Sequence, residues 1–300
     1  MQVFHFAFSA MGSPCQLQFY ASSAPYAQTV YTRVLHAIAA LEHRYSRYRE
    51  DSLISLINQR AGSGQVTPMQ AELFALLAYA DSCYQESDGL FDVTSGVLRK
   101  IWHGAQNLIP SAAEIESLLG LIGWPKVQWD AEGIYLPLTG MQLDFGGIVK
   151  EYAADAAANA CASMHISAGI IELGGDIRII GPRPDGTGWP VAIRDPRQSD
   201  SVVASLELKH GALASSGDYE RFQEIAGVRY SHLLNPKTGW PVSGLRAASV
   251  VAEHCVVAGS IATIAMLQAD HGNEWLAASG LPYLSCCQNG NIINRLCVEL

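Results

Sequence analysis

The stretch Ala-Gly-Ile-Ile-Glu-Leu-Gly-Gly-Asp-Ile-Arg-Ile-Ile occupies residues 168–180. Its two apolar runs are rich in isoleucine and are separated by a glycine pair and an aspartate, which is typical of two β-strands joined by a turn. Short apolar runs of the same kind follow at 189–193, 202–208 and 247–251. From residue 136 onward, the pattern therefore predicts a mostly antiparallel sheet.

Four other segments have the composition or spacing of helices. Residues 27–45 and 69–84 repeat apolar side chains every three or four positions, and residues 149–162 are rich in the helix former alanine. A fourth helix is expected over 256–268. Strands and helices occupy separate stretches without regular alternation, which favours an α+β fold over a doubly wound sheet.

Composition narrows the class of protein. The chain has 300 residues, of which 49% are hydrophobic, and its net charge is −9. No run of Lys or Arg is long enough to follow a phosphate backbone, which argues against nucleic acid as a partner. The longest apolar run, 256–267, is too short to span a bilayer, so we expect no membrane span.

The cysteines and the first residues indicate a compartment. Seven cysteines, an odd number without a Cys-x-x-Cys pair, predict neither a disulfide framework nor a zinc site. Residues 1–12 lack a Lys or Arg ahead of their apolar positions, so no secretory signal is expected. A reducing cytoplasm is the simplest location for such a chain.

Two glycine pairs indicate a place where a ligand approaches the main chain. They lie in Asp-Phe-Gly-Gly-Ile-Val-Lys at 144–150 and in Glu-Leu-Gly-Gly-Asp at 172–176. Paired glycines admit a ligand closely, and a helix that begins after them offers free amides to phosphate. Ordinary turns would also explain either pair. The dinucleotide fingerprint, the Walker loop, the nucleophile elbow and the zincin motif are absent from the sequence.

One histidine stands where a strand is expected to end. His232 precedes Asn-Pro-Lys-Thr-Gly at 235–239, which is a turn signal. A histidine at such a junction can face a ligand, and its pKa range suits it to remove a proton from a hydroxyl near neutral pH.

Taken together, eight ordered segments resemble the FAD:protein FMN transferase family, also known as thiamine biosynthesis lipoproteins. The segments are Met11 to Ser13, Ser46 to Arg49 with Asp51, Ser52 and Asn58, Gly89 to Thr94, the Asp144 loop, Leu173 to Asp176, Ser216 to Tyr219, Ser231-His232, and Pro236 to Gly239. The resemblance covers nearly the whole chain. It implies one domain over residues 1–300, built from two related α+β halves similar to a tandem T-fold, with FAD in a groove between sheet and helices.

The resemblance also implies the site residues. Positions that contact FAD in the family are matched here by Met11, Tyr48, Leu90, Phe91, Asp92, Asp144, Lys150 and Leu234. The ring of Tyr48 matches an aromatic that packs on the flavin. His232 matches the general base that activates a threonine or serine hydroxyl of an acceptor protein, which attacks the FMN phosphorus and releases AMP.

The implied Mg²⁺ site departs from the family pattern. Gly147 matches a position that gives a backbone carbonyl to the metal, and Thr263 matches a threonine ligand. The position one helical turn before Thr263, which holds an Asp in the family, is Gly259 here. Glu151 is also unusual, because the family commonly has Gly there. Glu151 either supplies the missing charge from the opposite wall or is a solvated helix residue, and Ser260 is a further weak candidate.

Two functional classes therefore remain. The chain is an enzyme, either a flavin transferase or a relative that hydrolyses FAD to FMN and AMP. Alternatively, it is a protein that binds FAD with weak or lost catalysis.

Overall fold

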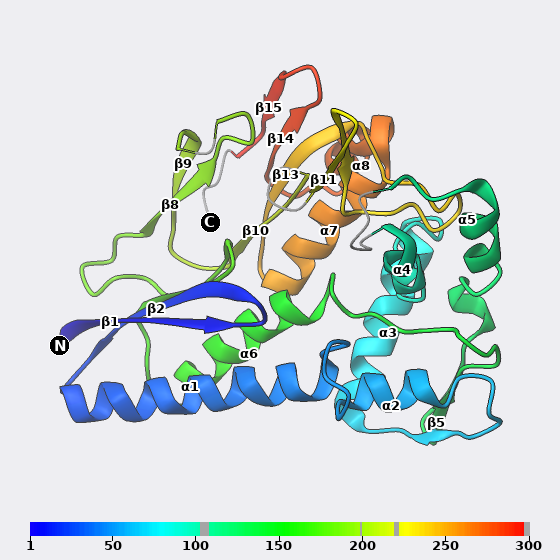
Figure 1. Ribbon diagram of the computed structural model, residues 1–300. Coiled ribbons are helices and arrows are strands. Elements are labelled where there is room, and N and C mark those ends of the chain that lie inside the picture. Colours follow the sequence, from blue (N-terminus) through cyan, green and yellow to red (C-terminus); the bar gives the residue numbers. More distant parts are fainter. Residues whose placement is uncertain (103–107, 199, 219–221, 297–300) are drawn as a thin grey trace.

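The computed structural model describes residues 1–102, 108–198, 200–218 and 222–296 (Figure 1). The strands are β1 (Gln2–Ala10), β2 (Ser13–Ala21), β3 (Thr67–Pro68), β4 (Gln128–Trp129), β5 (Gly133–Tyr135), β6 (Gly169–Leu173), β7 (Asp176–Gly181), β8 (Trp189–Arg194), β9 (Val202–Leu208), β10 (Ala212–Gly217), β11 (Phe222–Ile225), β12 (Val228–Ser231), β13 (Leu245–Ala252), β14 (Tyr283–Cys287) and β15 (Ile292–Asn294). The α-helices are α1 (Ala24–Tyr45), α2 (Leu53–Gln59), α3 (Ala71–Glu86), α4 (Arg99–Trp102), α5 (Ala112–Leu119), α6 (Val149–Ser163), α7 (Cys255–Leu267) and α8 (Gly272–Ala278). Short 3-10 helices are η1 (Ser95–Leu98), η2 (Trp124–Lys126) and η3 (Ala269–His271).

One large sheet organises the described part of the chain. It has eight strands in the order β1-β2-β6-β7-β10-β13-β14-β15. All of its neighbouring strands are antiparallel. The α+β class and the antiparallel pairing expected from the sequence are confirmed.

The order of elements repeats across the middle of this sheet. In the first four strands, β1 and β2 are followed by helices and then by β6 and β7; in the second four, β10 and β13 are followed by α7 and α8 and then by β14 and β15. We propose that the chain is one domain of two such related halves. Loss of far-ultraviolet circular dichroism and tryptophan fluorescence at different denaturant concentrations would contradict a single cooperative unit.

The two faces of the sheet are covered differently. Helices α1, α6 and α7 pack on one face and form the main core with side chains such as Ile171 and Val250. The hairpin β8-β9 packs on the other face, where Trp189 contacts a second cluster that includes Ile179 and Leu213. Figure 1 shows this hairpin apart from the helices. Strand alternation explains the split, because successive side chains point to opposite faces.

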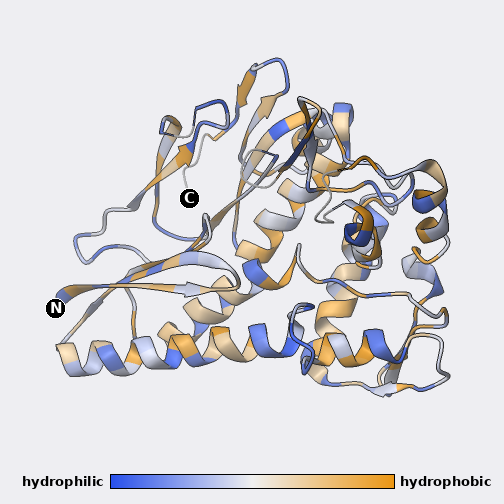
Figure 2. Ribbon diagram, viewed as in Figure 1, coloured by the Kyte–Doolittle hydropathy of each residue, from blue (hydrophilic) through white to orange (hydrophobic). Residues whose placement is uncertain are grey.

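The four predicted helices form close to their expected bounds. Helix α1 starts earlier than the spacing indicates, because Ser23 caps it by accepting a hydrogen bond from Tyr26 N at 3.4 Å and a proline stands in its first turn. Its hydrophilic and hydrophobic residues alternate along its length (Figure 2), as expected of a helix with one buried face. Helix α7 has little polar surface, and most of it is buried.

Strands β1 and β2 were not predicted from the sequence. Residues 2–8 alternate, with Phe4, Phe6 and Phe8 on one face, and this face packs partly against the main core. The recurrence of phenylalanine at every second position from Phe4 to Phe8 is a strand signal in the sequence. Strand β2 pairs with β6, which lies far along the chain.

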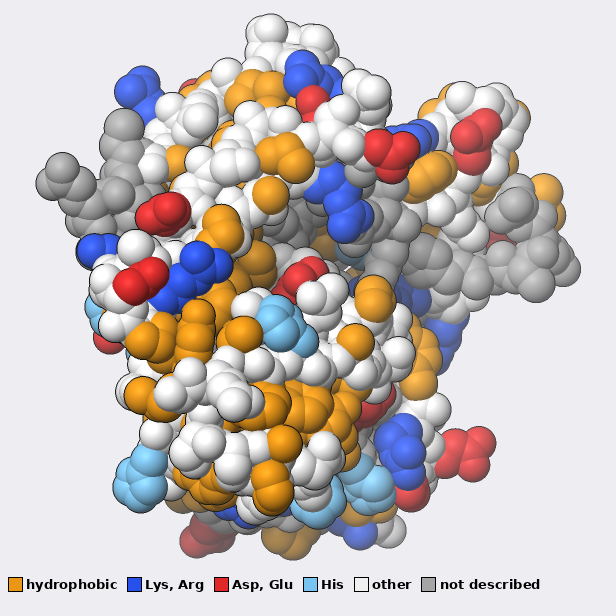
Figure 3. Space-filling view, turned by 90° about the vertical axis from the view of Figure 1, so that its left-hand side faces the viewer, with side chains coloured by type: hydrophobic (Ala, Val, Ile, Leu, Met, Phe, Trp, Pro, Cys, Tyr) orange, Lys and Arg blue, Asp and Glu red, His pale blue; other side chains and the backbone are white. Residues whose placement is uncertain are grey.

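No helix among the described residues is long and apolar enough to cross a membrane. On the face shown in Figure 3, Lys and Arg side chains lie scattered among Asp and Glu and alternate with hydrophobic areas.

Candidate functional site

A cavity of about 320 Å³ lies where both halves of the sheet meet the N-terminal end of α6 and the side of α7. Nine of the eleven site residues expected from the sequence line it: Leu90, Phe91, Asp92, Asp144, Gly147, Lys150, His232, Leu234 and Thr263. Met11 and Tyr48 are outside this lining. Tyr219, part of one matching segment, lies outside the described residues.

Met11 shapes a turn beside the cavity. Ala10 pairs with Ser13, which leaves Met11 and Gly12 as a two-residue hairpin turn with φ of 51° and 71°. Two successive positive φ angles define a type I′ turn and favour glycine at the second position. Ser13 and Pro14, directly after the turn, line the cavity, while Met11 packs against the main core.

Tyr48 lies on the surface beyond the end of α1, with 82% of its area exposed. The guanidinium of Arg47 lies 5.8 Å from its ring centroid. Arg47 also donates a hydrogen bond to Asp144 Oδ2 at 2.7 Å, and Asp144 is a lining residue. The exposed ring is therefore two contacts away from the cavity wall.

The segment that follows α3 is held by side-chain hydrogen bonds. Ser87 Oγ accepts from Phe91 N at 2.8 Å. Asp92 Oδ1 accepts from Thr94 N at 2.7 Å and Thr94 Oγ at 2.6 Å, and Oδ2 accepts from Trp124 N at 3.0 Å. Burial raises the pKa of Asp92, and the bonds from Thr94 oppose this shift. The carboxylate of Asp92 thus fixes the loop that carries Phe91 to the cavity.

Asp144 lies between two arginines. Its Oδ2 accepts from Arg47 and lies 3.4 Å from Arg99 Nε, and its Oδ1 accepts from Gly146 N at 2.9 Å. Gly147 follows, and a Cβ there would lie 3.3 Å from the Phe91 ring. Asp144 therefore orients the glycine loop against the Phe91 segment, and its charge is already paired.

Lys150 joins two carboxylates near the first turn of α6. Its ammonium forms an ion pair with Asp176, and Glu151 Oε1 lies 3.9 Å away. Burial lowers the pKa of Lys150, but Asp176 and Glu151 outweigh this effect and raise it overall. Asp176 also accepts from Ser215 N at 3.2 Å. Lys150 therefore stays charged in the cavity wall.

Glu151 is buried, with 7% of its area exposed, so the expectation of a solvated helix residue is wrong. It lines the cavity. Burial raises the pKa of Glu151, and Lys150 opposes the shift. Its Oε2 has no hydrogen-bond partner within the described part of the chain.

Position 259 lies directly against Glu151. A Cβ placed on Gly259 would lie 2.5 Å from Glu151 Cγ and 3.3 Å from its Oε1. Thr263, one turn further along α7, lines the cavity. Ser260 is buried beside Tyr79 of α3 and is outside the lining, which removes the support for it as a ligand.

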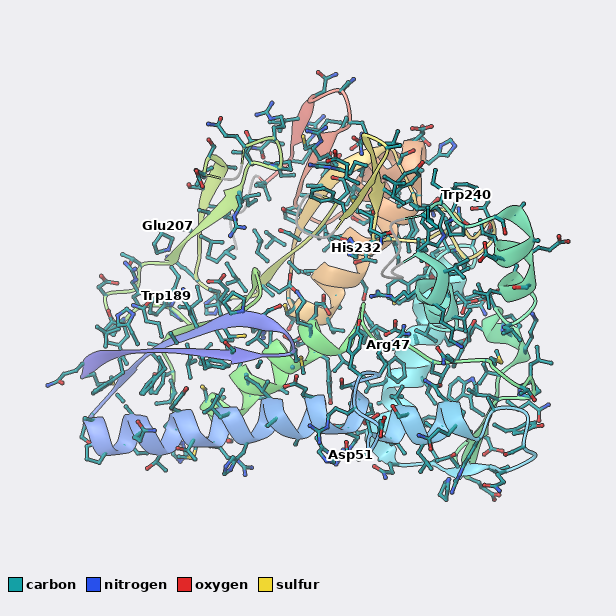
Figure 4. All side chains as sticks on the ribbon, viewed as in Figure 1. Arg47, Asp51, Trp189, Glu207, His232 and Trp240 are labelled. Atoms are coloured by element: carbon teal, nitrogen blue, oxygen red, sulfur yellow. The ribbon has the colours of Figure 1, made fainter. Side chains whose placement is uncertain are left out.

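His232 directly follows β12, as its position before a turn predicted. Ser231 Oγ accepts from Leu233 N at 3.1 Å, and Asn235 O accepts from Gly239 N at 2.8 Å. These bonds fix the backbone on both sides of His232 and Leu234. Figure 4 shows His232 beside α7.

Two cationic side chains in the cavity wall were not predicted from the sequence. Arg99 begins α4, and Arg194 ends β8 in the hairpin that covers the opposite face of the sheet. Both line the cavity together with Lys150. Arg194 comes from a distant hairpin, and nothing in its local sequence distinguishes it from a surface arginine.

The fold and the cavity define a class: α+β proteins with a cavity between an antiparallel sheet and its helices, lined here by Arg99, Lys150 and Arg194. The chain belongs to the ApbE family, whose model matches residues 11–285.

Individual relatives agree with this assignment. The FAD:protein FMN transferase of Klebsiella pneumoniae is 29% identical over 248 residues, 80% of this chain and 74% of that protein. The FAD:protein FMN transferase of Chlamydia trachomatis is 31% identical over 233 residues, 74% of this chain and 71% of that protein. The crystal structure of the ApbE protein from Thermotoga maritima has a TM-score of 0.89 at 30% identity and covers 98% of this chain and 97% of that one. The apo flavinyl transferase ApbE of Pseudomonas stutzeri has a TM-score of 0.86 at 27% identity, covering 97% of this chain and 93% of that one.

Proposed function

We propose that this chain is a FAD:protein FMN transferase that moves FMN from FAD to a threonine or serine hydroxyl of an acceptor protein and releases AMP. The observation that carries the proposal is that nine of the site residues expected from the sequence line one cavity. Family membership and the names of the relatives support the same reaction.

The cavity wall suits a flavin dinucleotide. Lys150, Arg99 and Arg194 supply positive charge for the diphosphate, and the amide of Gly147 lies just before the start of α6. Leu90, Phe91 and Leu234 offer apolar contacts. Tyr48, outside the lining and linked to it through Arg47 and Asp144, supplies an exposed ring for stacking on the flavin, and Met11 and Asp92 hold the surrounding turns.

His232 is the proposed general base. It removes the proton from the acceptor hydroxyl, whose oxygen then attacks the FMN phosphorus. The phosphorus–oxygen bond to AMP breaks, AMP takes the electron pair, and FMN remains on the acceptor as a phosphoester. Proton removal by a positioned histidine typically contributes about 10²–10⁴-fold to the rate.

A divalent cation fits the same wall. The carbonyl of Gly147 and the hydroxyl of Thr263 are hard oxygen ligands of the kind that Mg²⁺ prefers. The buried Glu151 Oε2, which accepts no hydrogen bond from the described residues, is a nearby negatively charged oxygen. Bound Mg²⁺ would neutralise charge that develops on the diphosphate oxygens.

Replacing His232 tests the assignment of the base. His232→Gln should lower Mg²⁺-dependent AMP release by about 10²-fold or more, while FAD binding, followed by quenching of flavin fluorescence, stays near that of the parent chain. Unchanged AMP release in the variant would remove His232 from the chemistry. FAD binding without AMP release by the parent chain would favour the alternative of a binding protein, and free FMN as product would favour a pyrophosphatase.

The location proposed for this reaction is the cytoplasm. Six cysteines in the described residues are free, and five of them are buried, which is compatible with a reducing compartment. Recovery of the chain with periplasmic marker proteins after cell fractionation would contradict this location.

A further inference from the structure

Helices α6 and α7 run antiparallel with a fixed register. Asp155 on α6 caps α7: its Oδ1 accepts from Cys255 N at 2.9 Å and its Oδ2 from Val256 N at 3.0 Å. Glu151 lies one turn before Asp155 on α6, and Gly259 lies one turn after Cys255 on α7. Glu151 contacts Gly259. A further turn in each direction reaches Gly147 and Thr263, which both line the cavity.

The absence of a side chain at position 259 is what admits Glu151. A Cβ at this position would lie 2.5 Å from Cγ, 3.1 Å from Cδ and 3.3 Å from Oε1 of Glu151. Non-bonded carbon atoms do not approach to 2.5 Å, so Glu151 in its present place and any side chain at 259 exclude each other. A glutamate at 151 and a glycine at 259 are therefore one structural feature.

The carboxylate of Glu151 also differs from its neighbours. Asp92 accepts hydrogen bonds from Thr94 and Trp124, and Asp144 accepts from Arg47. Glu151 Oε2, in a side chain more than nine-tenths buried, has no hydrogen-bond partner among the described residues. Buried carboxylate oxygens normally have a partner, and Lys150 Nζ, 3.9 Å from Oε1, lies beyond hydrogen-bond distance. The Oε2 atom is therefore suited to bind a cation at the cavity wall.

We propose that Glu151 is the carboxylate ligand of a divalent cation held between α6 and α7, with the Gly147 carbonyl and the Thr263 hydroxyl as neutral ligands. The carboxylate thus comes from α6, and Gly259 of α7 makes room for it. The inference rests on the proposed function for the use of the cation, but cation binding itself is measured separately.

The first test measures Mn²⁺ binding to the full chain by the loss of the free-ion electron paramagnetic resonance signal, without FAD and with saturating FAD. Glu151→Gln keeps the shape of the side chain and removes its charge. Its Mn²⁺ affinity should fall about 10-fold or more, since loss of a partner outside the ligand set already costs about 10–100-fold.

Glu172→Gln is the matched control, because Glu172 lines the same cavity. It should bind Mn²⁺ like the parent chain. Equal Mn²⁺ affinity in the parent chain and Glu151→Gln would overturn the inference. Equal weakening of Mn²⁺ binding in Glu151→Gln and Glu172→Gln would also overturn it, and so would a parent chain that binds no Mn²⁺ with or without FAD. A Glu151-dependent Mn²⁺ site in a chain that releases no AMP would support the inference and contradict the transferase.

The second test exchanges the two positions. Gly259→Asp alone should lower the thermal midpoint, because its Cβ meets Glu151. The double variant Glu151→Gly, Gly259→Asp should recover the midpoint and the Mn²⁺ affinity that Glu151→Gly loses. Additive losses in the double variant would show that the two positions act independently and would overturn the shared role.

Discussion

The register between α6 and α7 depends on Asp155, and its replacement by alanine should be among the costliest changes in the chain. Asp155 accepts two backbone hydrogen bonds at the start of α7, and its Oδ1 lies 2.9 Å from Arg178 Nε. The side chains of Asp155 and Arg178 are 10% and 16% exposed. Asp155→Ala therefore removes a helix cap and leaves a largely buried guanidinium without its carboxylate.

The magnitude follows from these two losses. Loss of a cap costs about 1 kcal/mol, and breaking a buried ion pair costs about 3–5 kcal/mol. The pair keeps some exposure and the two terms overlap, so we expect a total of about 3 kcal/mol. Asp155→Asn retains one accepting oxygen and should lose about half as much.

Urea unfolding followed by circular dichroism measures this loss, with Asp270→Ala on the exposed η3 as the control. With a slope of about 3 kcal/mol per M, the midpoint of Asp155→Ala should fall by about 1 M. A midpoint equal to that of Asp270→Ala would refute the reasoning, because the cap and the ion pair would then contribute nothing to the docking of α6 on α7.

Three further predictions concern other parts of the molecule. Gly239→Ala should destabilise the fold by about 2 kcal/mol or more, because the φ of Gly239 is +73° and a Cβ there would lie 2.4 Å from Ile115 Cγ2. Urea unfolding measures this loss, and an unchanged free energy of unfolding would contradict the turn geometry. Tyr48→Ala should weaken FAD binding about 3- to 10-fold with no change in thermal midpoint, because its ring is 82% exposed, and Tyr48→Phe should bind like the parent chain; unchanged affinity in the alanine variant would remove the ring from the flavin site. Hydrogen bonds from Arg197 lower the pKa of Asp195 from 3.8 to about 2, so the stabilising effect of the Asp195 carboxylate is present above pH 4 and is lost as pH falls towards 2. The difference in urea midpoint between the parent chain and Asp195→Asn should shrink over this range. A constant difference would contradict the ion pair.

Local patterns predicted much of the fold, and long-range pairing decided the rest. The isoleucine-rich apolar runs in residues 168–180 predict both β6 and β7, and the helical spacing of 27–45 predicts most of α1. The neighbours of a strand are set by tertiary packing, which is why the pairing of β2 with β6 and of β7 with β10 was beyond sequence reasoning.

The candidate site shows the same division. His232 was expected from its residue type and the turn that follows it, and Asp144 from its match to a family motif. Arg194 reaches the cavity from a separate hairpin and carries no local signal. The sequence alone left Glu151 either as the source of the charge missing at Gly259 or as a solvated residue. The close contact between the two positions comes from the helix register, which no local pattern shows.

The transferase assignment is tested most directly by following both halves of FAD in one reaction. The purified chain is incubated with FAD, Mg²⁺ and a dialysed protein extract as the source of hydroxyl acceptors, and AMP and flavin that stays on protein after denaturation are both quantified. We expect equal amounts of AMP and protein-bound FMN, neither of which forms when the chain is omitted. AMP with only free FMN, or no AMP although FAD is bound, would contradict the transfer of FMN to protein.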